Sequence, residues 1–199
     1  MRALGWIADR HREQGYLGCL QAAPYTLNGY CHMLAPKTLL FLAEVPRDVW
    51  PHGAEELRSA SIAALRDKQV FRSLPKRSRE FFDAVWPVPA RERDGVRERY
   101  LAEHPPLEWG DKPGWLRFGF PLSYNSDALE ALAALAAVGE TRRAEYDAAL
   151  EAVLSAADPE MRWTMRNSLN GKMIADVERK GEPSKWLTLR ASSVLEHFA

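Results

Sequence analysis

The sequence predicts an all-α fold arranged as an array of helical hairpins. Apolar residues recur at helical spacing along most of the chain. Segments that are apolar on nearly every side alternate with segments that have a single apolar face. The first kind is expected of buried inner helices and the second of outer helices that cover them. This alternation predicts a partial α/α toroid or a short solenoid, in which each hairpin buries its face on its neighbours.

Three helices are predicted in the first part of the chain. The opening residues have one apolar face and predict an outer helix that ends near Gly15. Residues 37–45 are apolar almost all round and predict an inner helix, which Pro46 helps to end. Residues 54–68 return to a single apolar face beside many charges. They therefore predict a second outer helix.

The same order returns in the last part of the chain. Residues 127–137 consist mainly of Ala and Leu and predict an inner helix, for which Ser126 is the expected N-cap. Residues 143–156 carry one apolar stripe and predict its outer partner. Pro183-Ser184 opens a final helix that reads as an inner one.

The chain is expected to form a single toroid-like domain over residues 1–199. A charged, proline-rich stretch at about 73–113 interrupts the helical order and predicts an insertion. Within it, residues 91–99 carry both charges and predict either a solvated helix or a flexible segment. Because the array begins on an outer helix without an inner mate, we expect the C-terminal part of a longer toroid, or a dimer.

Composition narrows the class of protein. Lys plus Arg and Asp plus Glu both total 27, so no net positive charge attracts nucleic acid. No segment reaches the roughly 20 apolar residues of a membrane span, and the N-terminus lacks an apolar stretch of signal-peptide length. With only Cys19 and Cys31, a disulfide framework is not expected. These features predict a cytoplasmic protein without nucleic-acid partners.

Four short segments carry a resemblance to a known superfamily: Leu39–Pro46, Trp115–Pro121 with Tyr124, Arg162-Trp163, and Gly181–Leu189. In these segments the chain resembles the terpenoid cyclase and protein prenyltransferase α/α-toroid superfamily. It is most similar to small bacterial proteins described as prenyltransferase-like or squalene-oxidase-repeat-like. The resemblance covers most of the chain and is weakest at residues 73–106. It implies a toroid with an apolar central cavity.

Two departures from the superfamily concern its chemistry. Triterpene cyclases of this fold protonate their substrate from an Asp-x-Asp-Asp run, and this sequence contains none. Protein prenyltransferases hold zinc with an Asp two positions before a Cys, and neither Cys19 nor Cys31 has one. The resemblance therefore implies the fold without its usual reactions.

Aromatic residues before the helix at 127–137 form the predicted ligand site, because in a toroid such positions line the central cavity. Flat aromatic walls hold apolar or isoprenoid-like molecules by contact and by cation–π attraction. The alternative is that the same rings are packing anchors. The aromatic candidates before this helix are Trp109, Trp115, Phe118, Phe120 and Tyr124, and Trp186 at the start of the final helix is a further candidate. The candidate cations for an anionic ligand group are Lys112, Arg117, Lys185 and Arg190.

A metal site is a further hypothesis. Cys19, Cys31 and His32 could supply thiolate and imidazole ligands to zinc, although free cysteines are also commonly buried as small apolar groups. Two acidic pairs, Asp127 with Glu130 and Asp176 with Glu178, could provide an acid or bind a divalent ion. For Asp127 the ordinary interpretation is a favourable charge in the first turn of a helix.

Three functions remain open from the sequence. The first is binding of an apolar or isoprenoid-like ligand in the concave face of the array. The second is a non-catalytic scaffold that self-associates through its open edge. The third is a degenerate prenyltransferase-like or terpene-cyclase-like enzyme, with zinc as its candidate cofactor.

Overall fold

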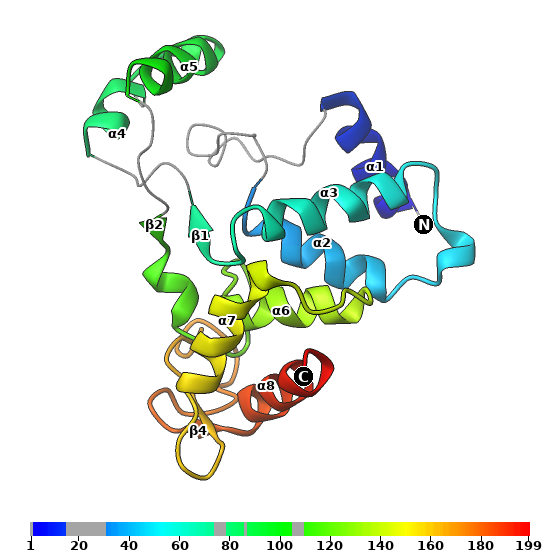
Figure 1. The fold of residues 1–199 in the computed structure, drawn as a ribbon, viewed down its shortest axis with the longest axis vertical. Helices are drawn as coiled ribbons and strands as arrows, with labels where there is room; N and C mark the ends of the chain where they lie inside the picture. Colours follow the sequence, from blue (N-terminus) through cyan, green and yellow to red (C-terminus); the bar gives the residue numbers. More distant parts are fainter. Residues whose placement is uncertain (1, 15–30, 74–78, 86, 105–109) are drawn as a thin grey trace.

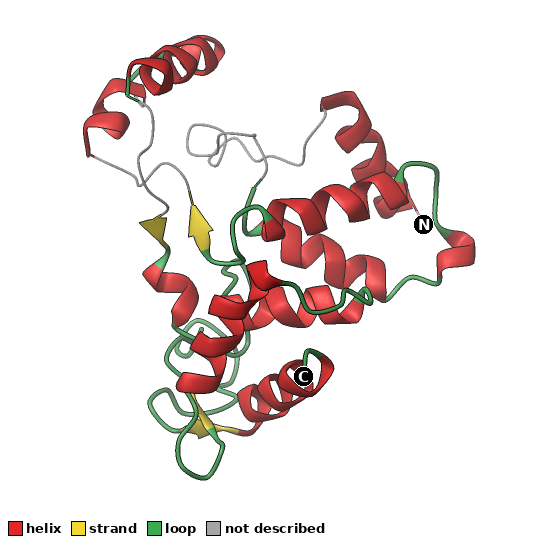
Figure 2. Cartoon of the chain, in the orientation of Figure 1, coloured by secondary structure: helices red, strands yellow, loops and turns green. Residues whose placement is uncertain are grey.

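The computed structural model describes residues 2–14, 31–73, 79–85, 87–104 and 110–199. Helices account for most of this part of the chain, and the strands in it form only short antiparallel ribbons (Figures 1 and 2). The all-α class predicted from the helical spacing is confirmed. No helix in these residues is long and apolar enough to cross a membrane.

The first helices are α1 (Arg2–Gln14), α2 (Leu34–Ala43) and α3 (Ala54–Arg66). A short 3-10 helix, η2 (Arg47–Val49), follows Pro46 and separates α2 from α3. Helix α3 packs on α2 and on α1. Leu39 and Leu42 of α2 are fully buried, as the all-round apolar character of this segment predicts.

A short ribbon brings together the two ends of the charged stretch. Strand β1 (Arg72–Ser73) pairs antiparallel with β2 (Gly110–Asp111). Between them lie α4 (Arg79–Val85), η3 (Ala90–Glu92) and α5 (Arg93–Glu103). Helices α4 and α5 contact each other and stand apart from the remaining helices in Figure 1. Of the two alternatives for residues 91–99, the structure has the helix, which begins at Arg93.

The last part of the chain contains three helices around a second ribbon. The 3-10 helix η4 (Pro113–Leu116) leads toward α6 (Ala128–Ala137), and α7 (Ala144–Ser155) follows. Strand β3 (Trp163–Thr164) pairs with β4 (Pro183–Ser184), which runs directly into α8 (Lys185–His197). Helix α6 packs on α2, α7 and α8, and Figure 1 shows it between α2 and α8.

Helix α6 begins one residue later than predicted. Its N-cap is Asp127, whose Oδ1 accepts the backbone N–H of Glu130 at 2.8 Å. The predicted cap, Ser126, instead donates its hydroxyl to the carbonyl oxygen of Met33 at 3.1 Å. Both Ser and Asp are common N-cap residues. Which of the two caps α6 therefore depended on a tertiary contact, the hydrogen bond of Ser126 to Met33 at the start of α2.

An ion pair joins the two central helices. Lys37 of α2 places its Nζ 2.6 Å from Oε1 of Glu130 in α6. The Glu130 side chain is buried, while Lys37 remains partly exposed. The positive charge of Lys37 thus compensates the charge of the Glu130 carboxylate, which would otherwise be buried without a charged partner.

Candidate functional site

A pocket of about 510 Å³ lies between α6 and α8, and we call it the α6–α8 pocket. Its volume is within the roughly 300–1,000 Å³ range of small-molecule sites. Helix α6 contributes small side chains, and α8 contributes larger ones. The lining residues are Phe120, Ala133, Ala136, Ala137, Trp186, Leu189, Arg190, Ser193, Val194 and His197.

Helix α8 has apolar side chains on two of its faces. Leu187 and Ala191 are buried in the core. Trp186 and Leu189, which line the pocket, are 42% and 62% exposed. Residues three and four positions apart share a helix face. A helix with two apolar faces therefore has apolar surface to bury on each of two sides. The second face of α8 is the one left open in this structure.

The three alanines of α6 create the space in the pocket. A run of small apolar residues predicts close packing of neighbouring helices, and α6 packs on α2, α7 and α8. The three alanines that line the pocket are nevertheless not fully buried: Ala133 and Ala136 are partly buried and Ala137 is exposed. Since an alanine side chain is a single methyl group, this face of α6 leaves room beside the larger residues of α8.

Two aromatic rings stack at the pocket. The centroids of Phe120 and Trp186 are 5.4 Å apart, with 16° between the ring planes. The guanidinium carbon of Arg190 lies 5.9 Å from the Phe120 centroid, and Nζ of Lys185 lies 5.9 Å from the Trp186 centroid. The structure thus brings together four of the residues predicted for a ligand site, although they come from separate segments.

Phe120 is positioned by a close backbone contact just before it. A Cβ atom on Gly119 would lie 2.6 Å from the carbonyl oxygen of Asn167. The neighbouring carbonyl of Phe118 accepts the backbone N–H groups of Arg166 and Asn167 at 2.9 and 3.1 Å. Only glycine allows the two chain segments to approach this closely.

The other predicted aromatic residues lie elsewhere. Trp115 and Phe118 are buried in the core, and the Trp115 ring stacks on His32 with centroids 4.0 Å apart. Tyr124 is 65% exposed and does not line the α6–α8 pocket. Trp109 lies outside the described residues. For Trp115 and Phe118, the structure agrees with the packing alternative.

Arg190 is the charged residue of the pocket with the fewest partners. Within the described residues its side chain makes no hydrogen bond or ion pair, and its Nη1 is shielded from solvent without an acceptor. The described lining of the pocket includes no carboxyl group. The pocket is therefore apolar with a positive charge at one side.

Asp127 does not line the pocket and is 1% exposed. Its Oδ2 accepts the backbone N–H of Gly119 at 3.0 Å, in addition to the bond from Glu130. Burial raises the pKa of Asp127 to about 6, even though both N–H groups and the charge of Arg190 favour the ionised form. This carboxyl group caps α6 and holds the segment that carries Phe120.

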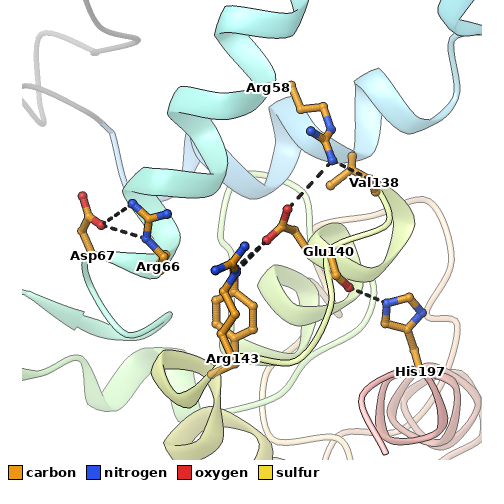
Figure 3. A network of polar contacts seen from close by, with 8 residues as sticks. Arg58, Arg66, Asp67, Val138, Glu140, Arg143 and His197 are labelled. Carbon is orange, nitrogen blue, oxygen red and sulfur yellow. Dashed lines mark hydrogen bonds and ion pairs between the residues drawn. The ribbon is translucent and has the colours of Figure 1, made fainter.

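A polar network fixes one end of the pocket (Figure 3). The Glu140 carboxylate lies 3.3 Å from Nε of Arg143 and 4.0 Å from Nη2 of Arg58, and it accepts the Tyr146 hydroxyl at 3.2 Å. The Glu140 carbonyl lies 2.7 Å from Nε2 of His197, a pocket residue. Burial, with help from the Glu140 charge, raises the pKa of Tyr146 to about 12. The network thus ties α3 and α7 to the end of α8.

The predicted zinc ligands are only partly described. Cys31 and His32 are both buried, and His32 places Nε2 2.6 Å from the carbonyl oxygen of Val70. Cys19 lies outside the described residues. In the part of the chain that the structure describes, no three His, Cys, Asp or Glu side chains gather as metal ligands. Zinc binding stays a prediction.

The second acidic pair serves the loop before α8. Asp176 accepts the backbone N–H of Gly171 at 2.9 Å. Glu178 accepts the Ser184 hydroxyl and, at 3.0 Å, the backbone N–H of Lys185. Ser184 in turn caps α8 by accepting the N–H of Leu187 at 3.1 Å. These carboxylates therefore act as local caps and turn anchors.

The sequence interpretation missed several pocket residues, including Ala136, Leu189 and His197. The available signal was in α8, where Trp186 and Leu189 lie on a different face of the helix from the buried Leu187 and Ala191. A second apolar face on a helix indicates a second contact. The helix that faces it across the pocket, α6, cannot be identified from the period of either helix.

No protein-family model matches the chain, and it has no match among curated proteins or solved structures. The resemblance to the α/α-toroid superfamily therefore stays a prediction.

Proposed function

We propose that this protein binds an apolar small molecule, of isoprenoid or similar size, in the α6–α8 pocket. The observation that carries the proposal is the stacked Phe120–Trp186 pair beside the alanines of α6, with Leu189 exposed next to it. Covering apolar surface of this kind gains about 25 cal/mol per Å² removed from water. A pocket with such a lining is the expected form of a small-molecule site.

We also propose that the helices form part of a toroid. Three helices predicted to be inner, α2, α6 and α8, follow one another as packed neighbours. Two helices predicted to be outer, α3 and α7, pack on α2 and α6 respectively. In a toroid, a pocket between α6 and α8 would lie on the inner, concave side. This is the place where the sequence predicts a ligand.

Binding without catalysis is the simpler form of the proposal. The described lining offers no carboxyl group to protonate a ligand. Asp127 is not part of the lining, is buried and already caps α6. The degenerate-enzyme alternative would need an acid that reaches the pocket.

A filled pocket is the test of the binding proposal. Ser193 is exposed and lines the pocket, so Ser193→Trp should occupy its volume without disturbing the core. Ser192 is exposed beside it and does not line the pocket, so Ser192→Trp is the matched control. Isothermal titration calorimetry with geraniol and 1-decanol, two neutral alcohols of equal carbon number, measures the Kd.

We expect the wild type and Ser192→Trp to bind at least one alcohol with similar Kd. We expect Ser193→Trp to lose about tenfold or more in affinity, since its indole competes for the same space. Equal affinity in all three proteins, or no binding by the wild type, would contradict the proposal.

A second function, self-association, is favoured by a separate observation. Between α7 and α8 lies a further pocket of about 350 Å³, lined in part by Leu154 and Leu195. Leu154 is 51% exposed there. Native mass spectrometry of the wild type and Leu154→Lys tests self-association. A wild-type dimer that becomes a monomer in Leu154→Lys would support this function, and a monomeric wild type would contradict it.

A further inference from the structure

We propose that the ligand of the α6–α8 pocket is a monoanionic amphiphile, an apolar chain that ends in a carboxylate, and that Arg190 binds its charged end. This inference rests on the proposed function, because it assumes that the pocket holds an apolar molecule. It adds the chemical class of the ligand and the residue that selects it.

Arg190 has unused capacity to donate hydrogen bonds. A guanidinium carries five N–H donors in a planar fork. Within the described residues, Arg190 donates none of them, and its shielded Nη1 lacks an acceptor. Arg190 lines the pocket and is only partly buried, so its N–H groups other than the shielded Nη1 are the ones available to an acceptor in the pocket. A hydrogen bond made there, beside apolar side chains, is electrostatically stronger than one made in water. The pocket therefore favours a ligand with an acceptor group near Arg190.

The charge of Arg190 is not neutralised by an ion pair in the described structure. Asp127 is close enough for the two charges to influence each other. Its oxygens, however, accept the backbone N–H groups of Gly119 and Glu130, and the residue is buried. The described lining itself contains no carboxyl group. An acceptor with a negative charge thus complements the pocket better than a neutral one.

The site fits one negative charge rather than several. Lys185 contacts the Trp186 ring but is not part of the pocket lining. The Nε2 atom of His197, which does line the pocket, is engaged by the Glu140 carbonyl. One guanidinium matches one carboxylate through two parallel hydrogen bonds, whereas a diphosphate calls for several converging cations.

The remainder of the pocket accepts the apolar end of such a molecule. Around Arg190 lie the Phe120 ring, which the guanidinium faces, and the aliphatic side chains of Leu189 and Val194. The opposite wall consists of the alanines of α6. A carboxylate on an apolar chain would place its charge at Arg190 and leave these surfaces for the chain.

The test compares decanoate with 1-decanol, which have the same number of carbons and differ in the charge of the head group. Both are titrated into the wild type, Arg190→Gln and Arg179→Gln at the same pH and salt concentration. Arg179 is highly exposed and is not among the residues that line the pocket, so its variant controls for the loss of one positive charge.

We expect the wild type and Arg179→Gln to bind decanoate about tenfold more tightly than 1-decanol. Arg190→Gln should lose this preference and bind the two ligands with Kd values within about twofold of each other. A cooperative thermal unfolding transition like that of the wild type shows that the variant still folds. Geranyl diphosphate should bind no more tightly than decanoate.

The outcomes separate this inference from the proposed function. If the wild type binds neither ligand, the proposed function fails. If it binds both equally, or if Arg190→Gln keeps the preference for decanoate, the pocket binds apolar molecules and the role of Arg190 is wrong. A clear preference for geranyl diphosphate overturns the assignment of a single charge.

Discussion

Asp127 links the start of α6 to the segment that carries Phe120. One oxygen accepts the N–H of Glu130 and the other that of Gly119, and both bonds are made in a buried position. The sequence indicates an acidic residue in the first turn of a helix, which is a common and favourable position. The raised pKa comes from burial by side chains that are distant in sequence.

Stability should therefore depend on pH through this residue. The pKa of Asp127 is raised from 3.8 to about 6, so its stabilising contribution is complete below about pH 4 and is lost as the pH rises through about 6. Asp127→Asn has a neutral side chain at every pH, so its stability lacks this pH dependence. We expect the free energy of unfolding of the wild type, relative to this variant, to fall by on the order of 3 kcal/mol between about pH 4 and pH 7.

Urea denaturation at a series of pH values measures this difference. Asp48→Asn, at an exposed position, controls for the loss of one carboxyl group. A difference between the wild type and Asp127→Asn that stays constant with pH would show that the pKa of Asp127 is not raised in the folded state.

The elements of this fold were predicted more closely than their contacts. The periodicity of the sequence locates α2, α3, α6, α7 and α8 within a few residues, because helix formation depends on neighbours three and four positions apart. The pairing of α2 with α6 follows from no local pattern. Lys37 and Glu130, which join these helices, are far apart in the chain.

Breaking this ion pair should destabilise the protein. Lys37→Met leaves the buried Glu130 carboxylate without its partner, and its other oxygen, Oε2, already lacks one. We expect a loss of about 3 kcal/mol in the free energy of unfolding, and recovery of most of it in the double variant Lys37→Met/Glu130→Leu. Arg10→Met removes an exposed pair with Glu13 and should cost less than about 1 kcal/mol.

Urea denaturation of the four proteins measures both effects. Equal losses for Lys37→Met and Arg10→Met would show that the α2–α6 ion pair contributes no more than an exposed one.

At the scale of the whole molecule, α4 and α5 form a separate excursion from the helical array. They contact each other, and the β1–β2 ribbon joins the chain on either side of them. None of the described residues that line the α6–α8 pocket comes from this stretch. The charged, proline-rich composition at 73–113 predicts an interruption of the helical array at this place. Such a prediction needs no tertiary information, because it depends only on residue types that are common in loops.

Removing this excursion should leave the pocket intact. Because Ser73 and Gly110 are paired in the ribbon, a short Asn-Gly turn can replace residues 74–109. We expect the shortened protein to unfold in one cooperative transition and to bind 1-decanol with a Kd within about twofold of the wild-type value. Differential scanning calorimetry measures the unfolding transition, and isothermal titration calorimetry measures the Kd. Loss of binding in a protein that still folds would show that residues 74–109 contribute to the pocket.

The sequence by itself determined the helical class and the approximate helix boundaries, because both depend on the spacing and composition of neighbouring residues. It also singled out Phe120, Lys185, Trp186 and Arg190 among a larger set of aromatic and basic candidates. Only the tertiary structure decided that Phe118 is buried while Phe120 lines a pocket. That division depends on the contact of Gly119 with Asn167, and on α8 packing beside α6, both of which join residues far apart in the chain.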